Sequence, residues 1–201
     1  MSLLSRRRAL MSQNREKYVF VEYIESTGTQ YIDTGFIPNQ NTTVTFDRQM
    51  TKLASGSAFG VRKDWTIMYR DFNVTSEGKC KLAQGPASGL VYMTLDTKRH
   101  LVERNKTTIY VDGKISIGFQ QYTFTCHDTL YLFTQNVENE GATGFINMKL
   151  FSFKLYDNGK LVRDFKPCYR KADKVAGLYD AVNGIFYENQ GTGKFLIGGE
   201  L

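Results

Sequence analysis

Glu138 and Glu140 are the two side chains whose spacing comes nearest to a catalytic carboxylate pair. Hydrolysis of a glycosidic bond needs two carboxyl groups about 5 to 9.5 Å apart. The chain contains no string such as Glu-x-Asp-x-x-Glu, which would line up several carboxyl groups along one strand. Glu138 and Glu140 instead lie in Q-N-V-E-N-E-G-A-T-G, whose Asn and Gly content favours a solvated loop. We therefore expect a protein that is not an enzyme.

Two other motifs resemble catalytic or nucleotide-binding patterns only in part. Cys126 and His127 are adjacent, and neighbouring residues on a strand point to opposite faces, so they do not predict a thiol nucleophile with its base. The stretch G-T-G-K at 191–194 lacks the first glycine of a phosphate-binding loop, and Phe195 stands where Ser or Thr is required. Neither motif predicts a site.

The cysteines and the Asp-containing turns predict neither a metal nor a cofactor. Cys80, Cys126 and Cys168 are odd in number and far apart, which is typical of reduced, buried thiols in a protein made in a cytoplasm. The turns at Asp112-Gly113 and Asp157-Asn158 supply fewer oxygens than the roughly six to eight that Ca²⁺ takes. We expect no metal, no cofactor and no catalytic residue.

Aromatic and polar side chains gather in the stretch D-W-T-I-M-Y-R-D at 64–71. Sugar-binding sites on β-sandwiches stack an aromatic ring on the ligand beside polar groups. The stretch is therefore the best local candidate for a glycan site, formed by Trp65, Tyr69, Arg70 and Asp71. The alternative is that Trp65 and Tyr69, four residues apart on one strand, both face the core.

The stretch 145–193 predicts the framework that must hold such a site. Its first part alternates apolar and polar residues, but the phase of this alternation changes once. Before the change the inward positions are Ile146, Met148 and Leu150, and after it they are Phe151, Phe153 and Leu155. We predict a β-bulge near Leu150–Phe151, or else a strand that is covered on both faces.

Two Asn-Gly pairs in the same stretch predict tight hairpin turns. In Asn158-Gly159 and Asn183-Gly184, both central residues of a primed turn can accept positive φ, and Asp112-Gly113 is a further pair of this kind. The strands joined by the two Asn-Gly turns include Lys160–Phe165, which we expect Pro167 to stop, and the pair Val175–Asp180 and Ile185–Tyr187. These hairpins predict an antiparallel sheet.

The remainder of the chain also contains only strand signals. Short alternating stretches recur roughly every 8–12 residues, without a convincing internal helix or repeat. The expected strands include 65–69, 91–95, 99–104, 107–111, 114–119, 122–126 and 130–134. The 201 residues, with 18 Gly and only 3 Pro, therefore predict one all-β domain at 18–201, a two-sheet antiparallel sandwich.

Residues 1–17 form a basic N-terminal arm. The arm holds five basic residues against Glu16, a net +4 of the chain's +6, so the body is nearly neutral and does not predict nucleic-acid binding. Its apolar residues would share one stripe of a helix beside the arginines. The residues assigned to assembly are Leu3, Leu4, Arg6, Arg7, Arg8, Leu10 and Met11. The alternatives are a frayed terminus and a nucleic-acid or membrane contact.

Three separated motifs carry a family resemblance. They are E-Y-I-E-S-T-G-T-Q-Y-I-D-T-G-F-I-P at Glu22–Pro38, F-K-L-Y-D-N-G-K-L-V-R-D-F-K-P at Phe153–Pro167, and G-L-Y-D-A-V-N-G-I-F-Y-E-N-Q-G-T-G at Gly177–Gly193. They resemble the concanavalin A-like lectin/glucanase superfamily, specifically a laminin G-like jelly-roll branch of gut bacteria and their phages. The resemblance implies a jelly roll with one concave and one convex sheet, and it supplies no catalytic pair.

The leader S-L-L-S-R-R-R-A-L-M resembles the starts of small phage structural proteins. This resemblance implies a virion protein, a head or tail decoration or fibre-type protein made in the host cytoplasm without a signal peptide. We expect the arm to bind capsid or tail proteins and the lectin-like sandwich to provide weak adhesion to host-surface glycans, with no membrane contact. Left open are a homo-oligomer, a cellular or cell-wall carbohydrate-binding module, and a glycosidase with an unrecognised site.

Overall fold

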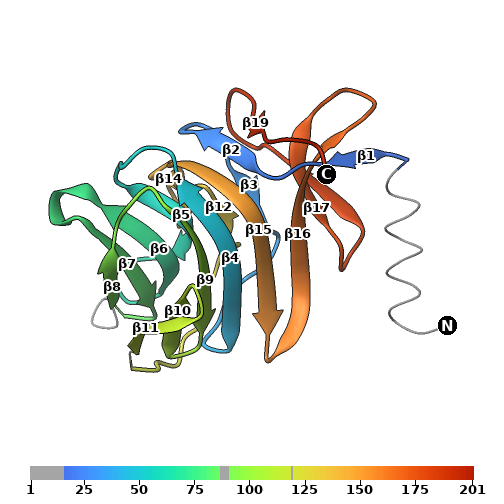
Figure 1. Ribbon diagram of the computed structural model, residues 1–201. Helices are drawn as coiled ribbons and strands as arrows, with labels where there is room; N and C mark the ends of the chain where they lie inside the picture. The colour runs from blue at the N-terminus through green and yellow to red at the C-terminus, as the bar shows by residue number, and fades with distance from the viewer. Residues whose placement is uncertain (1–15, 87–90, 119) are drawn as a thin grey trace.

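The protein is an all-β sandwich, as its alternating sequence predicts (Figure 1). The computed structural model describes residues 16–86, 91–118 and 120–201, which form two sheets that do not close into a barrel. This architecture is compatible with a jelly roll. Within these ranges the only helix is one 3₁₀ turn at Thr75–Glu77. The arm residues assigned to assembly lie outside the described residues.

The larger sheet has eleven strands, all paired antiparallel. Its main path runs through β11 (Lys114–Gly118), β10 (Thr108–Val111), β9 (Arg99–Asn105), β4 (Thr42–Met50), β15 (Asn147–Asp157), β16 (Lys160–Arg170), β17 (Ala176–Asp180) and β18 (Ile185–Glu188). Three short strands join this path at one end: β1 (Tyr18–Phe20) on β16, β2 (Ile24–Thr27) on β15, and β19 (Leu196–Ile197) on β2.

The smaller sheet has eight strands and faces the larger one. Its path is β14 (Gly141–Thr143), β13 (Gln135–Val137), β5 (Gly56–Arg62), β6 (Met68–Val74), β7 (Lys79–Gln84) and β8 (Val91–Thr94), with β12 (Tyr131–Leu132) between β5 and β3 (Ile32–Asp33). All pairs are antiparallel except β13 with β5. The chain turns between β12 and β13 at Phe133, whose φ is 66°.

The predicted bulge in the long strand is confirmed. The register of β15 against β4 shifts between Leu150 and Ser152, which leaves Phe151 as the extra residue. Met148, Leu150 and Phe153 are buried on the core side. The prediction that Phe151 also faces inward is wrong, because the bulge turns its ring outward, where it packs on Tyr23 and lies 3.6 Å from the guanidinium carbon of Arg99.

Two of the three predicted tight turns are confirmed. Asn158-Gly159 and Asp112-Gly113 have positive φ at both residues. The hairpin at Asn183-Gly184 also forms, but its turn has four residues, because Asp180 pairs with Ile185. Asp180 accepts hydrogen bonds from Val182 N at 3.0 Å and Asn183 Nδ2 at 2.8 Å, which favours the longer turn, and Gly184 takes the positive φ of 74°.

Pro167 does not end its strand, contrary to the prediction. β16 continues to Arg170, and the carbonyl of Pro167 accepts a hydrogen bond from Val21 N at 3.1 Å. The nitrogen and carbonyl of an extended residue point to the same side. On that side the pairing with β15 ends at Phe165 and the pairing with β1 begins at Cys168, so the proline nitrogen lies between the two ladders and is tolerated.

Other strand boundaries also differ from prediction. Residues 65–67 form a turn before β6, and 122–126 contribute only an isolated bridge between Thr125 and Asn39. The strands β5 and β7 were not predicted, since β5 reads G-S-A-F-G-V-R without regular alternation. A bulge between Ser57 and Phe59 accounts for the irregular pattern of β5.

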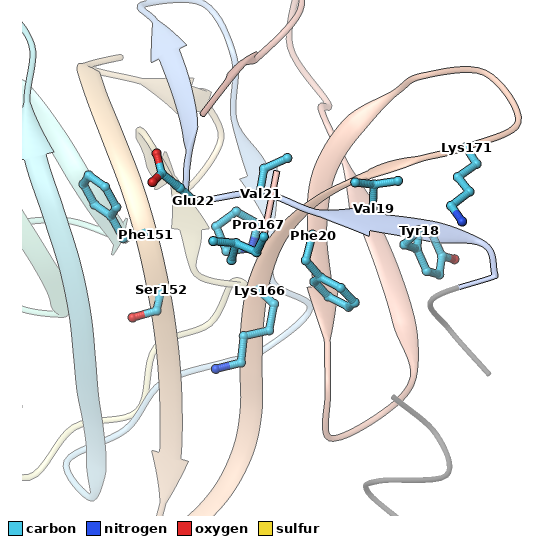
Figure 2. Close-up of a pocket in the computed structure, with 11 residues that line it drawn as sticks. Tyr18, Val19, Phe20, Val21, Glu22, Phe151, Ser152, Lys166, Pro167 and Lys171 are labelled. Atoms are coloured by element: carbon cyan, nitrogen blue, oxygen red, sulfur yellow. The ribbon is translucent and has the colours of Figure 1, made fainter. Parts of the chain in front are cut away.

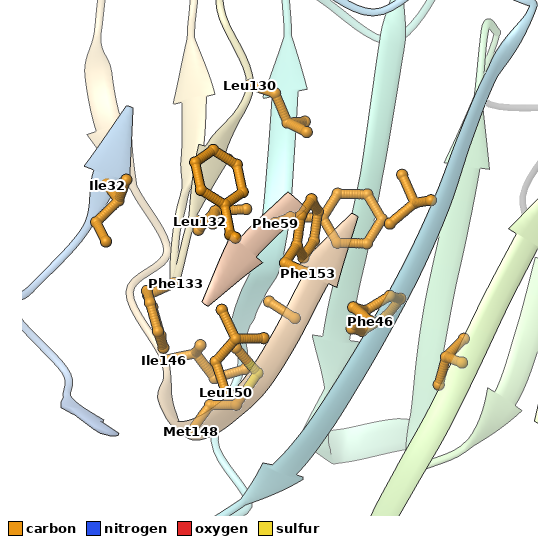
Figure 3. Packing of buried hydrophobic residues seen from close by; sticks show 14 of the residues in the cluster. Ile32, Phe46, Phe59, Leu130, Leu132, Phe133, Ile146, Met148, Leu150 and Phe153 are labelled. Atoms are coloured by element: carbon orange, nitrogen blue, oxygen red, sulfur yellow. The ribbon is translucent and has the colours of Figure 1, made fainter. Parts of the chain in front are cut away.

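Aromatic side chains from both sheets meet in the core (Figure 3). The ring of Phe59 in the smaller sheet lies edge-on to Phe46 and Phe153 in the larger one, with centroids 5.2 and 5.6 Å apart. The three cysteines are buried and unpaired, as predicted. Burial raises the pKa of Cys126 and of Cys168 to about 12, so both stay protonated at neutral pH.

Charged side chains also cross between the sheets. Arg104 on β9 is fully buried, lies 4.0 Å over the ring of Tyr69 on β6, and donates to the carbonyl of Ala83 on β7 at 2.7 Å. Arg48 on β4 pairs with Asp71 on β6 at 3.8 Å, and both are buried. Buried charges are costly unless they are paired, so these contacts impose one alignment of β6 on the larger sheet.

A histidine clamp, formed by His100, Asp96 and Asp112, joins two turns at one edge. Asp96 Oδ1 lies 3.0 Å from His100 Nε2, and Asp112 Oδ2 lies 2.8 Å from His100 Nδ1. Asp112 also accepts a hydrogen bond from Leu101 N at 3.0 Å. The His100 contact, followed by the Leu101 hydrogen bond, lowers the pKa of Asp112 from its ordinary value.

We expect Asp71→Asn to lower the free energy of unfolding by about 3 kcal/mol or more, because it leaves buried Arg48 without a counter-charge. Urea unfolding measures the loss. The matched control is Asp47→Asn, whose partner Arg99 is 55 % exposed, and we expect it to cost less than about 1 kcal/mol. Equal losses in the two variants would contradict the assigned role of the buried pair.

We expect Asp112→Asn to destabilise the protein at pH 7 but not at about pH 2. A carboxyl whose folded pKa is lowered stabilises the fold above its unfolded pKa of about 3.9, and this contribution disappears as the pH falls through the folded pKa. Asn tolerates the positive φ of 51° at this position. Urea midpoints between pH 7 and 2 test the effect, and a pH-independent difference would contradict it.

Candidate functional site

The structure does not bring the four predicted glycan-binding residues together. Tyr69 and Asp71 point into the core of the sandwich and are fully buried. Arg70 lies between them on β6, so it points to the outer face of the smaller sheet. Trp65 precedes the strand and is 58 % exposed. The alternative prediction, that Trp65 and Tyr69 both face the core, is therefore right for Tyr69 and wrong for Trp65.

Trp65 is presented by a turn that Asp64 fixes. Asp64 Oδ1 accepts hydrogen bonds from the backbone nitrogen and hydroxyl of Thr66, each at 2.6 Å, and from Ile67 N at 3.2 Å. These contacts, with the Thr66 side chain foremost, lower the pKa of Asp64. The backbone of Lys63 closes the turn by donating to the carbonyl of Ile67 at 3.0 Å. The indole is therefore held on an ordered turn although it is exposed.

Two arginines lie against the indole. The guanidinium carbon of Arg62 is 4.8 Å from the centroid of the Trp65 ring, and that of Arg70 is 5.4 Å from it. Arg70 is only 4 % exposed, contacts the ring of Phe72, and donates to Gln135 Oε1 at 2.9 Å. Burial and then the charge of Arg62 lower the pKa of Arg70 to about 10. We call Trp65, Arg62 and Arg70 the Trp65 cluster.

A glycine leaves the space that Arg70 and Gln135 occupy. Gly60 on β5 is the register partner of Arg70, and a Cβ atom at Gly60 would lie 2.8 Å from the Cβ of Gln135 and 2.9 Å from that of Arg70. Both distances are shorter than real Cβ contacts, so no other residue fits without a shift. The close approach keeps Arg70 against Gln135 below the indole.

A groove of about 500 Å³ opens at the opposite sheet, beside β1. It lies where the bulged β15 separates from β16, and Figure 2 shows Phe20 and Lys166 extending to the same side of β1 there. Its lining residues are Tyr18, Val19, Phe20, Val21, Glu22, Phe151, Ser152, Lys166, Pro167, Lys171 and Leu201. Sequence reasoning missed this groove. The sequence signals that could have indicated the groove were the bulge at Phe151 in β15 and Pro167 inside β16.

The residues considered for catalysis are dispersed. Cys126 is buried while His127 is 46 % exposed, so the adjacent pair does face opposite ways, as predicted. His127 Nδ1 instead lies 3.4 Å from Glu138 Oε1, and Glu140 is exposed in the turn that precedes β14. Among the described residues, no three His, Cys, Asp or Glu side chains are grouped to hold a metal ion.

No protein-family model matches the chain, and no curated protein matches it. No helix within the described ranges is long and apolar enough to cross a membrane. The architecture therefore stands as an all-β sandwich compatible with a jelly roll, and function must be argued from the Trp65 cluster.

Proposed function

We propose that the protein is a non-enzymatic glycan-binding sandwich displayed on a phage particle. In this proposal the Trp65 cluster contacts host-surface sugars weakly, and the N-terminal arm attaches the chain to capsid or tail proteins. The observation that carries the glycan-binding part is the exposure of Trp65, the single tryptophan of the chain, on an ordered turn.

An exposed, ordered indole favours binding over a structural role. Tryptophan is a large apolar side chain, and a structural one would be largely buried. Trp65 keeps more than half of its surface in solvent, while Arg62 and Arg70 support its ring. An aromatic face held in this way can stack on the C–H groups of a sugar with little loss of side-chain freedom on binding.

The non-enzymatic part is supported by where the acidic residues lie. Asp71 forms a buried ion pair with Arg48, and the Asp64 carboxylate accepts hydrogen bonds from its own turn. Glu138 faces His127 rather than a second carboxylate. General acid and base catalysis of sugar hydrolysis requires two carboxyl groups on one substrate, and none of these acids has such a partner near Trp65.

The phage part of the proposal is supported by the sequence resemblance and by the position of β1. The first described strand after the arm is β1, which begins at Tyr18 and pairs with the last residues of β16. β1 belongs to the larger sheet, whereas Arg62 and Arg70 of the Trp65 cluster belong to the smaller one. A cellular carbohydrate-binding module would use the same Trp65 cluster.

We expect Trp65→Ala to weaken glycan binding at least about tenfold while the fold stays intact, because stacking on the ring is lost. A glycan array followed by calorimetry on the best ligand measures this. Ile185→Ala is the matched control, since it removes another exposed apolar side chain from the larger sheet. Unchanged affinity in Trp65→Ala would contradict the proposed site.

We expect deletion of residues 1–16 to abolish incorporation into particles and to leave the sandwich folded, because β1 begins at Tyr18. Mass spectrometry of purified particles measures incorporation, and thermal melting of the isolated truncated protein measures stability. Incorporation at the level of the full chain, or a melting temperature that falls on deletion, would contradict this division of roles.

A further inference from the structure

We propose that the Trp65 cluster selects anionic glycans, and that Arg62 contacts the carboxylate or sulfate group of the sugar. This inference rests on the proposed glycan-binding function and adds the chemical class of the ligand. It follows from two positive charges beside one exposed aromatic face.

Neither arginine of the cluster has a counter-charge in the part of the chain that the structure describes. None of the ion pairs there includes Arg62 or Arg70. The acids nearest to the cluster in sequence have other partners, because the Asp64 carboxylate accepts the hydrogen bonds of the turn and Asp71 pairs with Arg48 in the core. Glu138, which lies beside Arg62 through strand pairing, has its carboxylate against His127. The cluster therefore holds two guanidinium groups that have no carboxylate in ion-pair contact among the described residues.

The two guanidinium groups are close enough to repel each other. Arg62 and Arg70 lie against the same indole, and the charge of Arg62 contributes to the lowered pKa of Arg70. The Nε atoms of both side chains are buried without a hydrogen-bond partner among the described residues. An anion at the cluster would relieve the repulsion, which a neutral sugar cannot do.

The positions of the two arginines give them different roles. Arg62 ends β5 and is partly exposed while its Nε is buried, so we assign the ligand contact to the two terminal nitrogens of its guanidinium. Arg70 is buried below the indole and held by Gln135, so it supports the ring and adds to the positive field. The planar fork of an arginine matches the paired oxygens of a carboxylate or sulfate.

The test compares three trisaccharides by calorimetry at 0.15 M salt: trigalacturonate, a sulfated galactotriose and neutral galactotriose. We expect both anionic sugars to bind at least tenfold more tightly than the neutral one. Arg62→Gln should reduce their affinity to that of the neutral sugar, whereas binding of the neutral sugar changes less than twofold. A preference for only one anionic sugar would identify which acidic group the cluster recognises.

The control variant is Lys160→Gln, which removes one positive charge from the exposed β15–β16 turn of the other sheet. We expect it to retain the preference for anionic sugars. An equal loss in Lys160→Gln and Arg62→Gln would show attraction to net charge only and would overturn the inference. If all three sugars bind equally, and Trp65→Ala abolishes this binding while Arg62→Gln does not, the preference for anionic glycans is overturned but the glycan site at Trp65 is retained. If none of the three sugars binds, both the anionic preference and the glycan site are rejected.

Discussion

The contact of Arg104 with the smaller sheet is the constraint on which the proposed binding surface depends. Arg104 lies over Tyr69, and Arg48 pairs with Asp71, so two alternate residues of β6 are fixed toward the core. Arg70 lies between them and must point outward. It then supports Trp65 from below. The buried charges between the sheets thus determine which side chain stands under the exposed indole.

Much of the framework could be predicted from local patterns, because bulges and tight turns leave local signals. The phase change at Leu150–Phe151 and the Asn158-Gly159 turn depend on residues adjacent in sequence. Pro167 was misjudged because its tolerance within β16 depends on β1, a strand far away in the chain. Tertiary pairing, which local patterns do not contain, decides such positions.

The candidate site was predicted only in part for the same reason. The alternation of Trp65, Ile67 and Tyr69 favoured one strand, but Asp64 bonds to Thr66 and converts the start of that strand into a turn. An Asp two residues before a Thr was the available signal. The role of Arg62 had no local signal, since it depends on a ring contact across that turn.

The central claim is that Trp65 touches the ligand, and fluorescence tests it directly because the chain has one tryptophan. A saturating glycan should shift the emission to shorter wavelength and protect the indole, now 58 % exposed, from quenching by acrylamide. Both changes should follow the same binding curve as calorimetry. Saturation by a glycan with unchanged emission and unchanged quenching would contradict the account, because the ligand would then bind away from Trp65.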